Sequence, residues 1–228
     1  MTFFYSQPRT ALITGASRGI GSTIATCLRE AGVKVIAPTR KELDLASSTS
    51  IKNYINQNQG RKIDILINNA GINALNLIEQ ISPSDWAEMI QINLTAPLQL
   101  IQSFSSQMRH QNWGRILNVS SIFGIVTKEQ RAAYSATKAG LNGLTRTAAV
   151  ELGPFNILVN SICPGYVDTA LTHQNNSPKQ IEAIQESIPL KRMAHSEEIA
   201  RLVLFLCSEA NSYLTGQSIV IDGGFTCR

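Results

Sequence analysis

The sequence has few of the residues that build metal centres, disulfide scaffolds or membrane spans. Of its 228 residues only 3 are histidines and 4 are cysteines, and no two cysteines form a C-x-x-C pair. Metal sites and disulfide scaffolds need such residues at short spacings. We therefore expect no metal, reduced thiols and a cytoplasmic protein. No apolar run approaches the roughly 18 residues of a membrane span, so we expect no membrane partner.

Charge is scarce as well: charged residues make up 16% of the chain and the net charge is +4. Lysines and arginines are scattered rather than gathered into a run, so we expect no nucleic-acid partner. Hydrophobic residues make up 43%, which is ordinary for a globular protein. A chain of this length can bury a sizeable core, and no linker or repeat interrupts it. We expect one domain over residues 1–228.

Short apolar runs alternate with longer, helically patterned segments along the chain. Strands are expected at 10–14, 33–37, 63–67, 115–119, 157–162 and 218–221, and helices at 20–31, 48–59, 83–93, 97–111, 134–152 and 197–208. We expect Ser82 and Ser196 as helix caps. A further strand is expected at 43–45, because no crossover helix fits between Arg40 and Leu45. This alternation predicts an α/β fold with a doubly wound parallel sheet, the three-layer Rossmann fold.

A glycine-rich turn joins the first expected strand to the first expected helix. It reads Thr14-Gly15-Ala16-Ser17-Arg18-Gly19-Ile20-Gly21. Glycines allow a tight turn and a close backbone approach, and the free N–H groups at a helix start attract a pyrophosphate. The spacing G-x-x-x-G-x-G differs from the standard G-x-G-x-x-G fingerprint. From these residues alone, a dinucleotide site and a plain packing turn both remain open.

The same turn also matches G-x-S-x-G, the nucleophile elbow of α/β-hydrolases, through Gly15, Ser17 and Gly19. That fold needs strands before the elbow, and only nine residues precede Thr10. A hydrolase would also have to recruit one of the three histidines together with a downstream acid. We therefore disfavour this interpretation.

Tyr134 and Lys138 stand four residues apart at the start of the helix expected over 134–152. Side chains at this spacing are neighbours on one helix face. A nearby ammonium favours the phenolate, so the pair predicts a tyrosine pKa below its usual value of about 10 and a proton donor usable near neutral pH. Taken alone, such a pair is common on solvated helix faces.

Two more motifs accompany the glycine turn and the Tyr134 and Lys138 pair. Asn68-Asn69-Ala70-Gly71 follows a buried apolar run, and Ser121 stands thirteen residues before Tyr134. With these motifs in this order, the chain resembles the short-chain dehydrogenase/reductase family over almost its whole length.

The resemblance implies roles for four residues. Tyr134 would be the catalytic acid/base, and Lys138 would hold the nicotinamide ribose and lower the tyrosine pKa. Ser121 would hydrogen-bond the substrate oxygen, and Asn93 would fix a water in a proton relay. Ser120, the neighbouring serine, remains the alternative to Ser121.

The resemblance also implies a dinucleotide site. The glycine turn would hold the pyrophosphate, the loop 69–71 the adenosine side and 44–45 the adenine. In the loop 164–169, Val167 would present its backbone to the carboxamide and Thr169 would reach the phosphates. Besides Tyr134 and Lys138, the expected cofactor-binding residues are Gly15, Ser17, Arg18, Gly19, Ile20, Gly21, Arg40, Asp44, Leu45, Asn69, Ala70, Gly71, Pro164, Gly165, Val167 and Thr169.

The end of the second expected strand bears on the choice of dinucleotide. An NAD site places an acid there for the ribose 2′-hydroxyl, whereas an NADP site brings arginine to the 2′-phosphate. This chain has Thr39 followed by Arg40, and Arg18 lies in the glycine turn. Two guanidiniums can bracket one phosphate, so we expect NADP(H), with NAD(H) as the alternative in which Asp44 supplies the acid. The segment after Arg40 is shorter than in typical members, which leaves the adenine side less covered.

The expected function is NADPH-dependent reduction of a ketone to a secondary alcohol. The stretches 188–193 and 216–224 resemble bacterial 3-oxoacyl-[acyl-carrier-protein] reductases, although sugar and polyol dehydrogenases of the family share them. We expect a 3-oxoacyl-thioester or other small-molecule carbonyl substrate under a mobile lid at about 168–196. A sugar or polyol dehydrogenase and a non-catalytic NADP-binding regulatory protein are the alternatives. Family members pair the helices equivalent to 97–111 and 134–152, which implies a homotetramer or homodimer.

Overall fold

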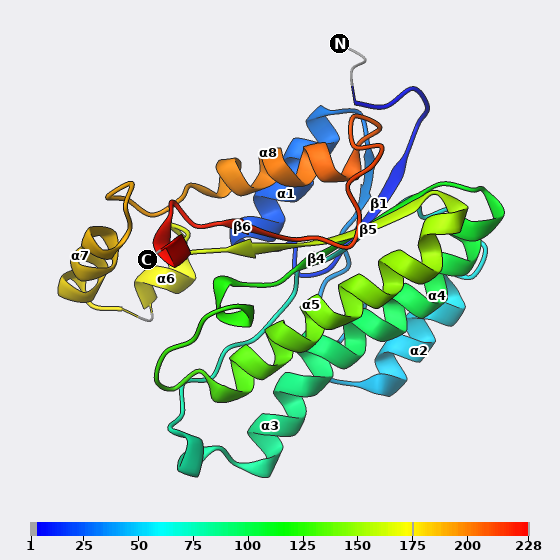
Figure 1. The fold of residues 1–228 in the computed structure, drawn as a ribbon. Helices are drawn as coiled ribbons and strands as arrows, with labels where there is room; N and C mark the ends of the chain where they lie inside the picture. Colours follow the sequence, from blue (N-terminus) through cyan, green and yellow to red (C-terminus); the bar gives the residue numbers. More distant parts are fainter. Residues whose placement is uncertain (1–3, 175, 228) are drawn as a thin grey trace.

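The computed structural model describes residues 4–174 and 176–227, and their centre is one parallel sheet (Figure 1). Its strand order is β2-β1-β3-β4-β5-β6, and every neighbouring pair runs parallel. The strands are β1 (Thr10–Ile13), β2 (Lys34–Ile36), β3 (Ile65–Asn68), β4 (Gly114–Val119), β5 (Ile157–Pro164) and β6 (Ser218–Ile221). The predicted doubly wound α/β fold is confirmed.

Helices cover both faces of the sheet (Figure 1). Helices α1 and α8 pack on one face, and α2, α4 and α5 lie on the other, with α3 extending from that layer. The helices are α1 (Gly19–Glu30), α2 (Ser48–Gln57), α3 (Pro83–Ile90), α4 (Ala96–His110), α5 (Ala132–Leu152), α6 (Ala170–Gln174), α7 (Pro178–Ser187) and α8 (Ser196–Cys207). No helix of the described residues is long and apolar enough to cross a membrane.

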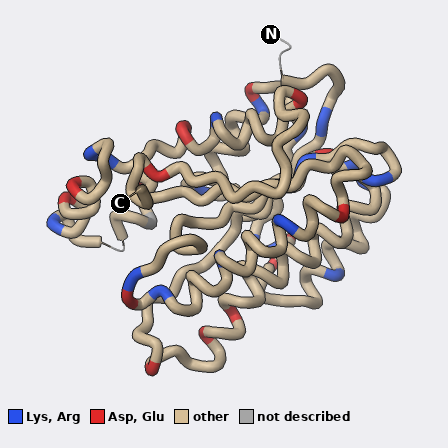
Figure 2. The backbone as a smooth tube through the Cα atoms, in the orientation of Figure 1, with Lys and Arg blue, Asp and Glu red and all other residues tan. Residues whose placement is uncertain are grey.

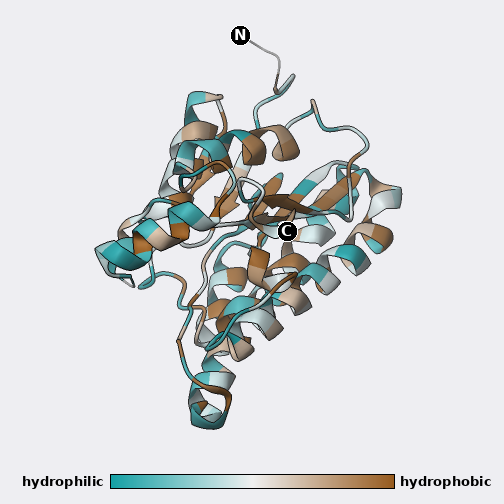
Figure 3. Ribbon diagram, turned by 60° about the vertical axis from the view of Figure 1, so that its left-hand side comes forward, coloured by the Kyte–Doolittle hydropathy of each residue, from teal (hydrophilic) through white to brown (hydrophobic). Residues whose placement is uncertain are grey.

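Each face of the sheet has its own apolar core, and Figure 3 shows the hydrophobic residues concentrated on the strands and the inner helix faces. Every residue of β3, β4 and β5 is buried. Strands covered on both faces need continuous apolar runs rather than alternation, which is why these segments were recognisable in the sequence.

The predicted strand at 43–45 is wrong, because this segment is a turn. The Leu43 amide donates to the Thr39 carbonyl at 2.9 Å, and the Asp44 side chain accepts from the Ala46 amide at 3.1 Å. Leu43 and Leu45 are nevertheless buried in the core beneath α2. The apolar residues at 43 and 45 therefore predicted correctly which side chains are buried, but not the conformation of the backbone.

The ends of the six predicted helices lie within three residues of their expected bounds, but one cap and one turn differ from the prediction. Ser82 caps α3, as predicted, by accepting a hydrogen bond from the Asp85 amide. Ser196, however, is the first residue of α8 and His195 is its N-cap. Between α3 and α4 the chain forms a π-helical turn, Gln91–Thr95, which the sequence did not reveal. Such turns often mark functional sites.

The strand order reverses direction at β1, which pairs with β2 on one side and β3 on the other. In open α/β sheets, ligands bind beyond the carboxyl ends of the strands at such a switch point. Here the glycine turn follows β1, and Asn69 follows β3.

Candidate active site

The glycine turn lines a cavity of about 420 Å³ beyond β1 and β3. Gly15 and Gly19 have φ angles of +67° and +57°, a region that favours glycine. A Cβ atom on Gly15 would lie 2.8 Å from the Ala70 Cα, so any side chain there would collide with the loop after β3. The turn thus fits closely against its neighbour.

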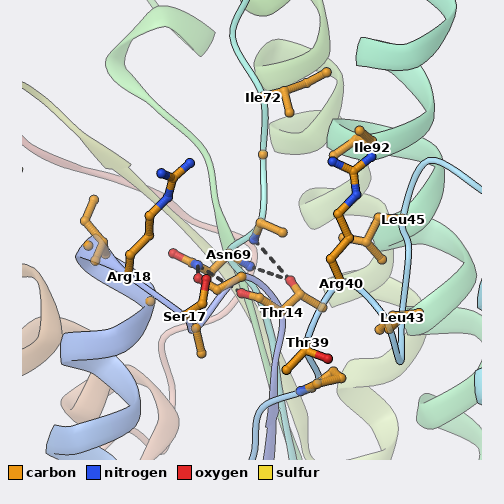
Figure 4. Close-up of a pocket in the computed structure, with 18 of the residues that line it drawn as sticks. Thr14, Ser17, Arg18, Thr39, Arg40, Leu43, Leu45, Asn69, Ile72 and Ile92 are labelled. Carbon is orange, nitrogen blue, oxygen red and sulfur yellow. Dashed lines mark hydrogen bonds between the residues drawn. The ribbon is translucent and has the colours of Figure 1, made fainter. Parts of the chain in front are cut away.

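Hydrogen bonds tie the ends of β1 and β3 together (Figure 4). The Asn69 side-chain amide donates to the carbonyls of Thr14, at 2.9 Å, and Gly15, at 3.0 Å. In return, the Thr14 hydroxyl accepts from the backbone amides of Asn69 and Ala70, both at 3.1 Å. The cavity wall is therefore built by protein contacts alone.

Helix α1 begins at the cavity. Its N-cap, Arg18, makes no side-chain capping hydrogen bond, so the first amides of the helix are available to a ligand. Free N–H groups and the helix dipole attract anions. Ser17, Gly19, Ile20 and Gly21 line the cavity here. These features fit the pyrophosphate of a dinucleotide.

Charged and polar side chains form the far end of the same cavity, where Thr39, Arg40, Asp44 and Leu45 line it. The Arg40 side chain is 79% exposed, and its Nε lies 3.5 Å from the Asp44 Oδ1. Figure 4 shows Arg18 and Arg40 on opposite sides of the cavity. In this structure Arg18 and Arg40 therefore do not form the two-arginine bracket that was predicted from the sequence.

Glu42 occupies the position next to Thr39, which sequence analysis overlooked. Its Oε2 accepts hydrogen bonds from the Thr39 amide, at 2.7 Å, and the Thr39 hydroxyl, at 2.9 Å. These bonds, the backbone one first, lower the pKa of the Glu42 carboxyl. The Glu42 carboxylate therefore occupies the two hydrogen-bond donors of Thr39 that would otherwise be available to a phosphate.

Four predicted residues lie near one another just beyond the cavity, whose lining includes Gly71 but none of the four. Tyr134 and Lys138 lie in the first turns of α5, and the Lys138 Nζ is 5.5 Å from the centre of the Tyr134 ring. A Cβ atom on Gly71 would lie 3.2 Å from the Asn93 Oδ1 and 3.4 Å from the Lys138 Nζ. Ser121, at the end of β4, approaches the Tyr134 phenol.

Asn93 is held by its side-chain amide. Its Oδ1 accepts from the Ile72 amide and its Nδ2 donates to the Ile72 carbonyl, both at 2.9 Å. Nδ2 also donates to the Thr137 hydroxyl of α5 at 3.2 Å. The π-helical turn thus connects the loop after β3 to the helix that carries Tyr134.

Burial dominates the titration of Tyr134 and Lys138. It raises the pKa of Tyr134, while hydrogen bonding to Ser121 and the charge of Arg131 act in the opposite direction. Burial also lowers the pKa of Lys138 to about 8. The predicted lowering of the tyrosine pKa by Lys138 is therefore wrong in this structure, where the Lys138 Nζ donates to the Val119 carbonyl at 2.8 Å.

Known proteins resemble this chain over nearly its full length. A family model described as Enoyl-(Acyl carrier protein) reductase matches residues 15–226. The chain belongs to the short-chain dehydrogenase/reductase family. The predicted resemblance is thereby confirmed, including its 3-oxoacyl-[acyl-carrier-protein] reductase relatives.

Three family members illustrate the range of relatives. The 3-oxoacyl-[acyl-carrier-protein] reductase FabG of Aquifex aeolicus is 38% identical, covering 96% of this chain and 97% of its own. A solved structure assigned as an NAD(P)-dependent gluconate 5-dehydrogenase from Beutenbergia cavernae, with bound NADP, has a TM-score of 0.94 at 33% identity, covering 99% of both chains. A 4-hydroxyisoleucine dehydrogenase complexed with NADH has a TM-score of 0.91 at 31% identity, covering 96% of this chain and 99% of that one.

The family spacing singled out Ser121, and the structure separates it from Ser120. The Ser120 hydroxyl donates to the Lys138 carbonyl at 3.1 Å, on the helix side of the strand end. Ser121 instead faces the phenol, and its hydroxyl also accepts from the Phe123 amide at 3.1 Å. Only Ser121 is thus oriented toward Tyr134.

The loop after β5 folds back toward the glycine turn. Thr169 lines the cavity, and its Cγ2 lies 3.9 Å from where a Gly19 Cβ would stand. Gly165 packs so closely on Asp222 that a Cβ would lie 2.7 Å from the Asp222 Cβ. Val167 is buried and forms a parallel bridge with Ala194. Pro164, Gly165 and Val167 do not line the described cavity; they lie beyond it on the same loop.

Besides Glu42, sequence analysis missed three residues that shape the site. Thr14 joins the two strand ends, and Ile72 holds Asn93. Arg131 lies one turn before Tyr134 at the N-cap of α5. The spacing of Arg131 from Tyr134 was visible in the sequence, but its orientation depends on the aromatic rings around it.

Proposed function

We propose that the protein is an NADPH-dependent reductase that converts a ketone to a secondary alcohol, with Tyr134 as the proton donor. The observation that carries the proposal is that Asn93 and Lys138 lie beside Gly71, which lines a cavity suited to a dinucleotide, and that Lys138 and Ser121 approach Tyr134. A raised pKa keeps the Tyr134 phenol protonated at neutral pH, as a proton donor requires.

The residues divide the work of holding the cofactor and moving the proton. The glycine turn and the start of α1 hold the pyrophosphate, and Lys138 holds the nicotinamide ribose. Bound NADPH supplies the hydride. Ser121 orients the substrate carbonyl toward the Tyr134 hydroxyl, and Asn93 positions a water beside Lys138 to replace the transferred proton. Thr39 and Arg40 favour the 2′-phosphate, because the residue that follows β2 at position 39 is a threonine rather than an acid; Glu42, bound to Thr39, acts against this preference.

A 3-oxoacyl thioester is the first candidate substrate, supported by FabG relatives that cover the chain almost completely. An oxo acid is the second. Gluconate and 4-hydroxyisoleucine, the compounds in the names of two structural relatives, both carry a carboxylate. The unpaired Arg131 beside Tyr134 is the observation in this chain that favours the second class.

Residues 168–196 are proposed to close over the substrate; residue 175 within this lid lies outside the described residues. Helix α7 contains no buried residue, although Ile188 just after it is buried. Elements with little buried surface open at low free-energy cost. Helix α7, which is anchored only through Ile188 after its end, is therefore suited to move as a lid during turnover.

We also propose a cytoplasmic homotetramer or homodimer. Val150 of α5 is 78% exposed, and Leu98 of α4 is 38% exposed. Large apolar side chains exposed on neighbouring helices suit a subunit contact. A sharp mass near that of the 24.9 kDa chain in light scattering at micromolar concentration would contradict the assembly.

The decisive experiment measures NADPH oxidation with a panel of 3-oxoacyl thioesters, diketones, oxo acids and keto sugars. Turnover of any ketone that disappears in Tyr134→Phe supports the reductase. Tight NADPH binding without turnover of any of them would favour the alternative, a non-catalytic NADP-binding regulatory protein.

A further inference from the structure

Arg131 carries a guanidinium for which residues 4–174 and 176–227 provide no hydrogen bond and no ion pair. Its Nε and Nη1 are shielded from solvent and have no partner. The Cζ atom stacks 5.0 Å from the centre of the Phe123 ring, and burial lowers the pKa of the guanidinium. Shielded charged donors without an acceptor are unfavourable, so a ligand acceptor is the natural partner.

The guanidinium lies close to the proposed proton donor. Phe123 contacts the rings of Tyr134 and Tyr166, with centroids 6.4 Å and 6.3 Å away. The positive charge of Arg131 acts to lower the pKa of the Tyr134 phenol, against the larger effect of burial, which raises it. These three rings, which we call the aromatic cluster, therefore place Arg131 beside the proton donor.

Two other cations near the aromatic cluster already have partners: Lys138 Nζ donates to the Val119 carbonyl, and Lys128 is bound to a ring of the cluster. Lys128 is exposed, and its Nζ donates to the Tyr166 hydroxyl at 3.1 Å. Figure 2 shows both basic and acidic positions in the loop before α5, because Glu129 lies between Lys128 and Arg131. The ion pairs of the described chain include neither Lys128 nor Arg131. With two basic residues and one acidic residue, the segment 128–131 carries one net positive charge.

We propose that Arg131 binds the carboxylate of a compact oxo acid whose ketone is held at Tyr134. Guanidinium groups pair with carboxylates through charge-assisted hydrogen bonds. Residues three apart on a helix have Cβ atoms about 5–6 Å apart, so the carboxylate must lie within a few bonds of the ketone. A 3-oxoacyl thioester has no charge at that distance. The inference rests on the proposed reductase and selects between its two substrate classes.

The test compares ketones that differ only in charge: acetoacetate with methyl acetoacetate, and levulinate with methyl levulinate. Wild-type enzyme should prefer the acid of each pair. In Arg131→Met, kcat/KM for the acids should fall about 10- to 150-fold, the range expected for a lost charge-assisted bond, mainly through KM. The values for the neutral esters should change less than threefold, and Arg131→Lys should recover part of the loss.

Lys128→Met is the matched control, because it removes a neighbouring cation that already has a partner. Its kcat/KM for the acids should stay within threefold of wild type. An equal loss for acids and esters in Arg131→Met would overturn the inference and assign Arg131 to positioning Tyr134. No loss for either would overturn it as well.

A binding measurement separates this inference from the proposed function. Acetoacetate should raise the Tm of the NADP-loaded wild-type protein but not that of Arg131→Met, whether or not it is reduced. An equal shift, or none, in both proteins overturns the carboxylate site. Absence of turnover across the panel, with the Tm difference present, contradicts the reductase and leaves the carboxylate site supported.

Discussion

The two ends of the proposed site are held in different ways. At the catalytic end, Lys138 is 3% and Asn93 1% exposed, and buried hydrogen bonds fix both. At the adenosine end, Arg40 is 79% exposed and Glu42 is also at the surface. Packing therefore fixes the position of the proposed reacting groups, whereas the charges proposed to set the cofactor preference lie at the surface. Substitutions should have large effects at the first end and small, separable ones at the second.

The largest effect is expected from Tyr134→Phe. The ring and its packing remain, but the proton donor is lost, so kcat should fall about 10²- to 10⁴-fold while NADPH binding changes only a few fold. Steady-state kinetics and a fluorescence titration of NADPH measure both. Tyr213→Phe, at a tyrosine that is 96% exposed, is the control. A Tyr134→Phe enzyme with more than a tenth of the wild-type kcat would remove Tyr134 from the proposed role.

Lys138→Met should reduce activity but increase stability. Burial lowers the lysine pKa from 10.5 to about 8, which corresponds to roughly 3 kcal/mol against the charged form at pH 7. A methionine of similar length avoids this penalty but cannot hold the ribose. We expect kcat/KM to fall at least tenfold and Tm to rise. A lower Tm would show that the Val119 contact outweighs the burial penalty.

The sign of the pH dependence follows from the same shift. Between pH 8 and 10.5 the unfolded chain keeps the Lys138 proton, whereas the folded protein has lost it. The unfolded state then binds more protons, so this group makes stability increase with pH across that window. Urea unfolding at pH 8 and pH 10 should show this contribution in wild type and its absence in Lys138→Met.

Arg40→Ala tests the exposed end. Because the guanidinium is mostly in solvent and already near Asp44, its contact with the 2′-phosphate is screened, and NADPH should bind only about two- to fivefold more weakly. NADH affinity should not change. Isothermal titration of both cofactors decides it; equal weakening of NADH and NADPH would show that Arg40 does not recognise the phosphate.

Glu42→Ala should act in the opposite direction and by a similarly small factor. Removing the carboxylate frees the Thr39 amide and hydroxyl and removes a negative charge near the phosphate. NADPH should bind about two- to fivefold more tightly, and NADH should be unaffected. Weaker NADPH binding would mean that Glu42 supports the turn rather than competing for its donors.

The sequence predicted most of the fold because each buried strand is a short run of mostly apolar residues. The prediction failed at 43–45 because residues there are buried without belonging to a strand: Leu43 and Leu45 reach the core from a turn. In the site, motif spacing brought Tyr134, Lys138, Ser121 and Asn93 together. It could not show that Glu42 turns back to Thr39 or that Arg131 lacks a partner, because both depend on side-chain directions set by distant contacts.

The π-helical turn Gln91–Thr95 makes this site sensitive to changes in chain length. A π turn carries one residue more than an α turn, so deleting Leu94 should restore a regular helix. Each residue advances an α-helix by about 100°, and that rotation would turn Asn93 away from Ile72 and Thr137 while the sheet stayed intact. Loss of a single codon would thus leave a folded dinucleotide-binding protein without its proposed proton relay, a short evolutionary step from enzyme to ligand sensor.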